Sequence, residues 1–570
     1  MIKIARVFSL FLATVILASC ATAPTFTEPH GFAVSVSDAF ADVSAYDFEY
    51  SNRDTTHSYS TDGATTITLG EDAKVSGSGA EIKDGDVIIT KEGTYILSGK
   101  HTSGMIYIEC TNTEKVQLVL NGAEIWAPDS PAIYIKQADK VFITTVKDTV
   151  NKLNDGDKYT YLDDATEIDA TVFSRADLTL NGEGRLEIIG NEKHGIVSKD
   201  DLIITGGTIT VRSDKVALDG KDCVKILNGN ITLNAGSDGI RSDNKDEAAR
   251  GFILISGGTL NINAEKDGIQ SEDMLRIDGG EITLNCGGGS KNTVESNKTE
   301  DKQPTVIDPS KGPEEDKPDS YKALKAEKDI LINGGRIIAD TADVCIFAEG
   351  SLHVNGGAIK LSSGGDAITA NNAFYQSAGA LYVTKALNAV TATKVLIKGG
   401  ETSLICSENA VKATEGAEVG GGYLIIDSGK CGITAATLLL SGGVTLIAPP
   451  ADGTSLTVNA NTAAYGGVLV AAGNSNGIND TAKQPAVLEK IAVQSGGTSL
   501  ALTDEKGNVV ASFTSSRGFD NVLITSPKLR AGKTYTVNVG GTLEASDANG
   551  YINGGKLTGG TAVANVEIPK

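Results

Sequence analysis

Apolar and polar residues alternate in short runs along most of the chain, and most runs follow a pair of glycines or a close variant of one. Ile209 with Val211 and Ile231 with Leu233 are two such runs. Alternation with a period of two, rich in β-branched residues, predicts strands with one buried face. A further aliphatic residue stands eleven positions after the second glycine, at Leu218, Ile240, Ile269, Ile346, Ile368, Val390 and Val411.

Several neighbouring glycine pairs are 22 residues apart, as from Gly207 to Gly229 and from Gly335 to Gly357, and insertions lengthen other steps. Three short strands per repeat predict one coil of a parallel β-helix, because a coil buries its inward residues only when neighbours stack on it at about 4.8 Å. A β-sandwich, the alternative, would not keep an aliphatic residue at one offset through seven repeats. We therefore expect an all-β chain in which residues 61–480 form a right-handed parallel β-helix, the default hand of parallel connections.

Several segments depart from this repeat, among them a small insertion, Asn244–Arg250, that splits one coil. Four prolines among charged and polar residues predict a disordered insertion at about residues 290–320. Residues 481–570 contain short apolar runs separated by turns such as Asp504 to Gly507. We expect this region to be a β module that caps the solenoid, because an uncapped sheet end would template aggregation.

The N-terminus has the features of an export signal. Lys3 and Arg6 precede an apolar run that is too short to span a bilayer. The run ends at Leu17-Ala-Ser-Cys20, which resembles the lipobox of bacterial lipoproteins and implies cleavage before Cys20 and lipidation of its thiol. We therefore expect a signal peptide at residues 1–19, and a lipidated Cys20 with a flexible tether at residues 20–60. The protein would be extracytoplasmic and held to the membrane through the lipid anchor only; an ordinary cleavage site with a chance cysteine is the alternative.

The chain is acidic, with 50 basic residues against 72 acidic ones and a net charge of −22. Such a chain should not bind nucleic acid or another polyanion through bare electrostatics, so a cation must mediate any contact with an acidic polymer. Beyond Cys20, six cysteines are expected to be buried apolar fillers, with disulfides as the alternative. These are Cys110, Cys223, Cys286, Cys345, Cys406 and Cys431.

Stacked coils place equivalent residues in columns. Two positions before the recurring aliphatic residue stand Asp238, Asp267 and Asp366. Three positions after it stand four consecutive carboxylates, Asp243, Glu272, Glu327 and Glu349. Carboxylates about 4.8 Å apart repel unless they are protonated, paired with lysine or bridged by a cation, and oxygen-only ligands suit calcium. We expect these seven residues to bind calcium; a solvated acidic face screened by Lys325, Lys328 and Arg241 is the alternative.

Basic residues cluster near the acidic columns and could hold the carboxylates of a uronate polymer. The candidates are Lys193, His194, Lys199, Lys221 and Arg241. Surface lysines without a ligand are the alternative explanation of this cluster.

Several phrases resemble a known family of surface carbohydrate-binding-domain β-helix proteins. They are Lys199-Asp-Asp-Leu-Ile-Ile-Thr-Gly-Gly-Thr-Ile-Thr-Val211, Ser237-Asp-Gly-Ile-Arg-Ser-Asp-Asn244, Lys266-Asp-Gly-Ile-Gln-Ser-Glu272 and the tail from Val522 to Val537. The resemblance implies a right-handed β-helix, bound calcium, and affinity for acidic, pectin-like polysaccharide without established catalysis. The family's Asp-Gly-Ile corner matches at Asp238 and Asp267, and it is replaced at His194, Val216, Val344, Asn388, Asn409 and Cys431.

We therefore expect a monomeric binding protein, not an enzyme, that holds uronate-rich polysaccharide through a calcium-loaded acidic edge. A polysaccharide lyase or hydrolase on the same β-helix is one alternative, since β-helix lyases combine calcium with a base. A structural or adhesive surface rod is another, because a solenoid with a tether and an anchor suits that role equally.

Overall fold

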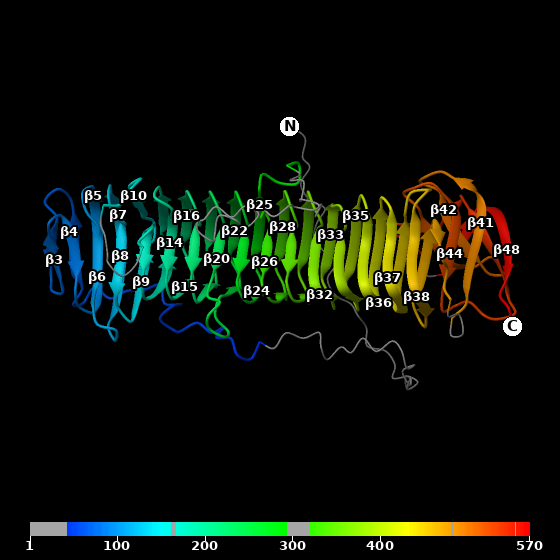
Figure 1. Ribbon diagram of the computed structural model, residues 1–570, viewed down its shortest axis with the longest axis horizontal. Coiled ribbons are helices and arrows are strands. Elements are labelled where there is room, and N and C mark those ends of the chain that lie inside the picture. The colour runs from blue at the N-terminus through cyan, green and yellow to red at the C-terminus, as the bar shows by residue number, and fades with distance from the viewer. Residues whose placement is uncertain (1–42, 161–166, 293–319, 480–483, 553) are drawn as a thin grey trace, which may run out of the picture. The chain divides into compact units, whose positions relative to one another are not determined.

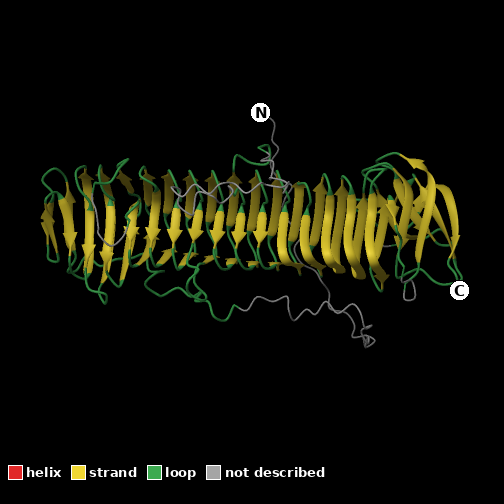
Figure 2. Ribbon diagram, viewed as in Figure 1, coloured by secondary structure: helices red, strands yellow, loops and turns green. Residues whose placement is uncertain are grey.

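The computed structural model describes residues 43–160, 167–292, 320–479, 484–552 and 554–570 (Figure 1). These residues form strands and turns and contain no helix (Figure 2). The predicted signal peptide, Cys20 and most of the proline-rich insertion therefore lie outside the described residues. In the described part of the chain, no helix is long and apolar enough to cross a membrane.

Successive coils stack in parallel and form three continuous ladders, which confirms the prediction of an all-β chain with a parallel β-helix. Ladder 1 contains β10 (Val150–Asp155), β13 (Arg185–Gly190), β16 (Thr208–Ser213), β19 (Asn230–Ala235), β22 (Thr259–Ala264), β25 (Glu281–Cys286), β28 (Arg336–Thr341), β31 (Ala358–Ser363), β33 (Ala380–Lys385), β35 (Glu401–Cys406) and β39 (Val468–Ala472). Ladder 2 contains β4 (Asp86–Ile89), β6 (Ile106–Glu109), β8 (Ile133–Gln137), β11 (Ala170–Ser174), β14 (His194–Ser198), β17 (Leu218–Gly220), β20 (Ile240–Ser242), β23 (Ile269–Ser271), β26 (Leu324–Ala326), β29 (Ile346–Ala348) and β40 (Asn474–Ser475). Ladder 3 contains β1 (Thr65–Leu69), β9 (Lys140–Thr145), β12 (Asp177–Gly182), β15 (Asp201–Ile204), β18 (Cys223–Ile226), β21 (Phe252–Ile255), β24 (Leu275–Ile277), β27 (Ile330–Ile332) and β30 (Leu352–Val354).

Longer strands turn a corner and belong to more than one ladder. They are β5 (Gly93–His101), β7 (Lys115–Ala127), β32 (Ile368–Gln376), β34 (Val390–Ile397), β36 (Asn409–Ser428), β37 (Cys431–Ala448) and β38 (Thr454–Ala464). Near the first coil, β2 (Lys74–Ser76) pairs antiparallel with β1, and β3 (Ala80–Lys83) with β4.

The recurring aliphatic residues face inward and stack directly on one another, as the 22-residue spacing predicts. Ile240 pairs in register with Leu218 on one side and Ile269 on the other, and Ile269 pairs with Leu324 across the proline-rich insertion. All four side chains are completely buried. The six cysteines beyond Cys20 are also buried and form no disulfide, so the prediction of apolar fillers is confirmed.

The glycine pairs form a corner at which successive backbones approach closely. Gly357 has a φ of +80°, and a Cβ at this position would lie 2.7 Å from the carbonyl oxygen of Gly335 in the preceding coil. Gly400 has a φ of +82° and a Cβ there would lie 2.5 Å from the oxygen of Gly379. Both the backbone conformation and the close contact therefore require glycine.

The C-terminal region changes from parallel to antiparallel pairing. It contains β41 (Ala486–Gln494), β42 (Ser499–Thr503), β43 (Val509–Thr514), β44 (Phe519–Thr525), β45 (Thr534–Val539), β46 (Thr542–Leu543), β47 (Leu557–Thr558) and β48 (Thr561–Glu567). Strand β44 pairs antiparallel with both β39 of the last coil and β41. The edge of the final coil is thus occupied by the chain itself, which removes an unpaired strand that could template aggregation.

Residues 43–58, which we call the strap, differ from the expected flexible tether. They lie along the outer surface of ladder 3, where Tyr46, Phe48 and Tyr50 pack against Phe252 and its neighbours. The sequence contains a short alternation of aromatic and acidic residues here, Tyr46-Asp-Phe-Glu-Tyr50, which is typical of an extended segment with one buried face.

We expect the substitution Ile269→Ala to lower the free energy of unfolding by about 2–5 kcal/mol, because it opens a cavity in the middle of the aliphatic stack. The exposed Thr259 on the same coil is the matched control, and Thr259→Ala should change stability by less than about 0.5 kcal/mol. Guanidinium unfolding followed by circular dichroism measures both. Equal midpoints for the two variants would contradict the inward stacking.

Candidate functional site: an acidic corner and a polar groove

The corner at which each coil passes from ladder 2 to ladder 3 is rich in carboxylates, and we call it the acidic corner. Its members on successive coils are Asp177, Asp200, Asp201, Asp222, Asp243, Glu272, Asp273, Glu327 and Glu349. The predicted column of Asp243, Glu272, Glu327 and Glu349 runs along this corner. Its register is fixed by backbone bonds, such as those from the Glu272 N–H to the Ser242 oxygen (3.0 Å) and from the Glu327 N–H to the Ser271 oxygen (3.0 Å).

Cations from ladder 2 lie beside this column. The Arg241 guanidinium is 2.6 Å from the carboxylate of Asp219 and 3.8 Å from that of Asp243. The Lys325 ammonium is 3.0 Å from Glu327. Burial by itself would lower the pKa of Lys325, but the charges of Asp267, Glu327 and Glu272 raise it above its usual value. Part of the column's charge is therefore neutralised by the protein itself.

Asp238, Asp267 and Asp366 lie at a different corner, between ladders 1 and 2, and act there as caps between coils. Asp238 accepts the backbone N–H of Asp267 (3.1 Å), Asp267 accepts that of Lys322 (2.7 Å), and Asp366 accepts that of Asn388 (3.0 Å). Burial and the neighbouring charge of Asp267 raise the pKa of Asp238 to about 6. The structure therefore separates these three predicted ligands from the exposed column.

A tighter carboxylate group occurs two coils before the predicted column, on the same corner. Asp177, Asp200 and Asp201 each present an oxygen within 4.8 Å of the others. Burial and the charges of Asp201 and Asp200 raise the pKa of Asp177 to about 7, although Lys140, at 3.8 Å, opposes this. We call these three residues the triad. The only hint of this group in the sequence is the adjacent pair Asp200-Asp201. Asp177 joins the pair because β12 stacks on β15.

The triad fits calcium by its donor set, since calcium takes carboxylate oxygens in a flexible geometry. Burial is the main cause of the raised pKa of Asp177, and the charges of Asp201 and Asp200 add to it. A divalent cation would offset the repulsion between these carboxylates. Zinc suits this group less well, because it contains no histidine or cysteine. Among the described residues, the predicted column does not bring three carboxylates as close together as the triad does.

The predicted basic residues are divided between two places. Lys193 and His194 lie at the corner of ladders 1 and 2, where both contact Asp169, at 3.7 and 3.5 Å. Burial lowers the pKa of His194, and its Nδ1 accepts the Val216 N–H at 3.2 Å. Lys199 and Lys221 begin the column that continues as Asp243 at the acidic corner.

Arg250 was not anticipated among the basic residues of the acidic corner. It comes from the seven-residue insertion Asn244–Arg250, and its guanidinium lies 3.4 Å from Asp201 and 3.6 Å from Asp222. An insertion breaks the 22-residue spacing, so no column in the sequence could place this residue.

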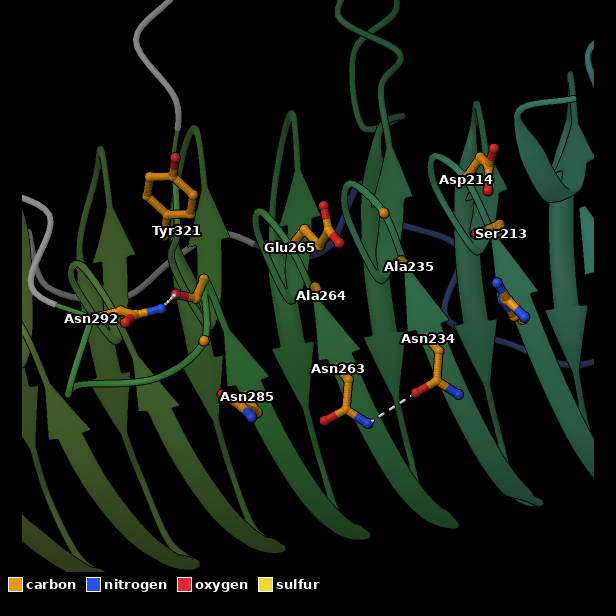
Figure 3. A pocket seen from close by; sticks show the side chains of 14 residues that line it. Ser213, Asp214, Asn234, Ala235, Asn263, Ala264, Glu265, Asn285, Asn292 and Tyr321 are labelled. Atoms are coloured by element: carbon orange, nitrogen blue, oxygen red, sulfur yellow. Dashed lines mark hydrogen bonds between the residues drawn. The ribbon is translucent and has the colours of Figure 1, made fainter. Parts of the chain in front are cut away.

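A groove of about 850 Å³ follows the corner between ladders 1 and 2 (Figure 3). Asn234, Asn263 and Asn285 form its floor in register on β19, β22 and β25, and the Asn263 amide donates to Asn234 at 3.1 Å. Glu265, on the turn after β22, and Tyr321 also line it. The groove thus offers a row of uncharged amides, one per coil, beside an aromatic ring.

We expect Asp177→Asn to stabilise the protein at pH 8 and to have little effect at pH 4. The pKa of Asp177 is raised on folding, so folding favours its protonated form and stability is lost as pH rises from about 4 to about 7. The gain at pH 8 is at most about 4 kcal/mol, and solvent screening reduces it because 30% of the side chain is exposed. Unfolding midpoints in calcium-free buffer test this, with Asp246→Asn, an exposed site, as control; a gain at pH 4 as large as at pH 8 would contradict it.

Comparison with known proteins places this chain in a family. A solved structure of the polysaccharide lyase-like protein from C. thermocellum, as a gadolinium derivative, is 34% identical, covers 40% of this chain and 92% of that chain, and gives a TM-score of 0.39. A carbohydrate-binding domain-containing protein from Acetivibrio thermocellus is 37% identical over 136 residues, which are 24% of this chain and 48% of that protein, so the match spans about half the length of this curated relative. The family model of carbohydrate-binding domain-containing proteins matches residues 83–367, half of the chain. The chain belongs to the family of carbohydrate-binding domain-containing proteins.

Proposed function

We propose that this protein binds acidic, uronate-rich polysaccharide through calcium held at the acidic corner, and that it does so without catalysis. Membership of a carbohydrate-binding family supports polysaccharide as the ligand. The observation that carries the calcium proposal is the triad, whose three carboxylates offer oxygen atoms within 4.8 Å of one another. Asp243, Glu272, Glu327 and Glu349 extend the same corner over later coils and would attract further cations.

Calcium resolves the charge problem that a net charge of −22 creates for binding a polyanion. A divalent ion on the triad would join protein carboxylates to uronate carboxylates, because calcium takes six to eight oxygen ligands and the triad leaves positions open. Lys199, Lys221 and Arg250 lie along the same corner and would contact further uronate groups. The coil spacing of about 4.8 Å is comparable to the length of one sugar unit, so successive coils would meet successive sugars.

We further propose that the protein acts outside the cytoplasm as a monomer, held to the membrane through a lipid on Cys20 only. The support is the apolar segment after Lys3 and Arg6 and its ending at Leu17-Ala-Ser-Cys20. One chain of lipid gives marginal binding and two give stable anchoring, so diacylation of Cys20 would hold the protein firmly.

The polar groove supports a second binding surface, for uncharged polysaccharide. Asn234, Asn263 and Asn285 can both donate to and accept from sugar hydroxyl groups. Tyr321 adds an aromatic ring whose face could cover the apolar side of a sugar. These three amides carry no charge and would bind sugar hydroxyl groups without a cation, although Arg212, Asp214 and Glu265 also line the groove.

We expect calorimetry with polygalacturonate to show binding in calcium and none in excess chelator, using the chain that begins at Ala21. Asp200→Asn combined with Asp201→Asn should weaken calcium-dependent binding at least about tenfold, a loss of about 1.4 kcal/mol. Asp246→Asn is the control. Undiminished binding in chelator would contradict the calcium bridge, and unsaturated products absorbing in the ultraviolet would establish a lyase instead.

We expect Asn234→Ala combined with Asn263→Ala to abolish retardation by a soluble uncharged glucan in affinity electrophoresis, because two adjacent floor amides are lost. Calcium-dependent binding of polygalacturonate should be unchanged, since the groove and the acidic corner lie on different corners. Thr283→Ala, at an exposed position of β25 outside the groove, is the control. Equal retardation of the double variant and the parent would exclude the groove as the neutral-glycan surface.

A further inference from the structure

The strap alternates between buried and exposed residues. Tyr46, Phe48 and Tyr50 are partly buried, whereas Asp47 and Glu49 are exposed. Phe48 and Tyr46 pack edge-on against Phe252, with ring centroids 5.4 and 5.6 Å away. An extended segment with one aromatic face is therefore fitted to the apolar surface of β21.

The face of ladder 3 beneath the strap points outward and yet is almost inaccessible to solvent. Thr179, Ile203, Lys225 and Leu254 follow one another in register along it, and each is 2% exposed or less. The Lys225 ammonium donates to the backbone oxygens of Glu49 (2.9 Å) and Asp47 (3.3 Å). The strap thus covers the Lys225 ammonium and also supplies the acceptors that a buried charge requires.

Asp54, in the second half of the strap, binds the solenoid through its side chain and its backbone, and it is 1% exposed. Its carboxylate accepts the Thr179 hydroxyl at 2.6 Å and lies 2.9 Å from the Lys140 ammonium. Its backbone oxygen accepts the Thr205 hydroxyl at 2.6 Å. Thr179 belongs to β12, and Thr205 directly follows β15. These are the two strands whose first residues, Asp177 and Asp201, are members of the triad.

Lys140 lies between two carboxylates that belong to different parts of the chain. Its ammonium is 2.9 Å from Asp54 of the strap and 3.8 Å from Asp177 of the triad. Only 11% of its side chain is exposed, so water screens the competition weakly. With the strap in place, the shorter contact is with Asp54, and the triad keeps more of its negative charge.

We propose that the strap is coupled to cation binding at the triad through Lys140. Docking of Asp54 keeps the Lys140 ammonium nearer to the strap (2.9 Å) than to Asp177 (3.8 Å). The triad then stays more negative than a closer Lys140 contact would leave it, which favours a divalent cation. Release of the strap frees Lys140 to move closer to Asp177 and lowers the affinity of the triad. By linkage the effect is reciprocal, so a cation on the triad repels Lys140 toward Asp54 and tightens the strap.

This coupling rests on the proposed calcium site, and it assigns Asp54 and Lys140 as positioning residues, not ligands. It also connects the site with the N-terminal segment from which the strap begins. A force or a partner that displaced residues 43–58 would thereby weaken the hold of the acidic corner on its cation. In Figure 1 the described chain begins beside the middle coils of the solenoid, near β21, and not beside the first coil, which contains β1.

The rate of tryptic cleavage after the exposed Arg53 measures how often the strap leaves the surface, because trypsin needs an extended, unpacked segment. On the full chain, we expect calcium to slow cleavage at Arg53 at least about threefold, a coupling of roughly 0.6 kcal/mol. Phe48→Ala should accelerate this cleavage in calcium-free buffer. Glu49→Gln, an exposed strap residue, should cleave as the parent does.

Calorimetry with calcium alone supplies the reciprocal measurement. Asp54→Asn should lower calcium affinity severalfold, and Lys140→Met added to it should restore the affinity, because no ammonium remains to pair with Asp177. Equal calcium affinity in the parent and Asp54→Asn, or cleavage at Arg53 that calcium does not change, would overturn the coupling while leaving the calcium site standing. Absence of calcium binding in the parent would overturn both the site and the coupling.

Discussion

The parallel stacking of one coil on the next is the constraint on which the rest of this structure depends. Inward positions place matching residues on one another, as Ile240, Ile269 and Leu324 do. Every glycine corner must let two backbones approach within van der Waals contact, as at Gly335 and Gly357. The solenoid therefore tolerates insertions at its corners, where a loop can leave and return, but not within its strands.

The same stacking creates an electrostatic problem on the outside. Equivalent positions on neighbouring coils are about 4.8 Å apart, so a recurring carboxylate meets its own copy. The protein meets this problem in three ways. Asp238 and Asp267 become caps for the next coil. Arg241 lies 3.8 Å from Asp243 of the column, and Lys325 pairs with Glu327. In the triad, burial together with the charges of Asp201 and Asp200 raises the pKa of Asp177, which favours its uncharged form.

The strap packs against an outer face of the solenoid whose residues complement it in polarity. Leu254 is unsuited to a solvent-facing strand, yet it suits the aromatic rings that cover it, and Lys225 donates to the backbone oxygens of the strap. The outer face of β12 to β21 is thus covered, whereas the groove and the acidic corner stay accessible. Lys140 connects the covered face with the acidic corner, because its ammonium contacts Asp54 and Asp177 together.

The sequence by itself determined the coil, its register and the position of each column, because an aliphatic residue eleven positions after the second glycine aligns Leu218, Ile240 and Ile269 even where the insertion Asn244–Arg250 lengthens a coil. It also indicated an acidic edge, since Asp243, Glu272 and Glu327 fall in one column. Only the tertiary structure decided which carboxylates gather, because Asp177 and Asp200 occupy different offsets and meet through the corner geometry. Arg250 and Asp54 reach the same region from an insertion and from the strap. Their contacts join residues far apart in sequence, and no periodic pattern encodes such contacts.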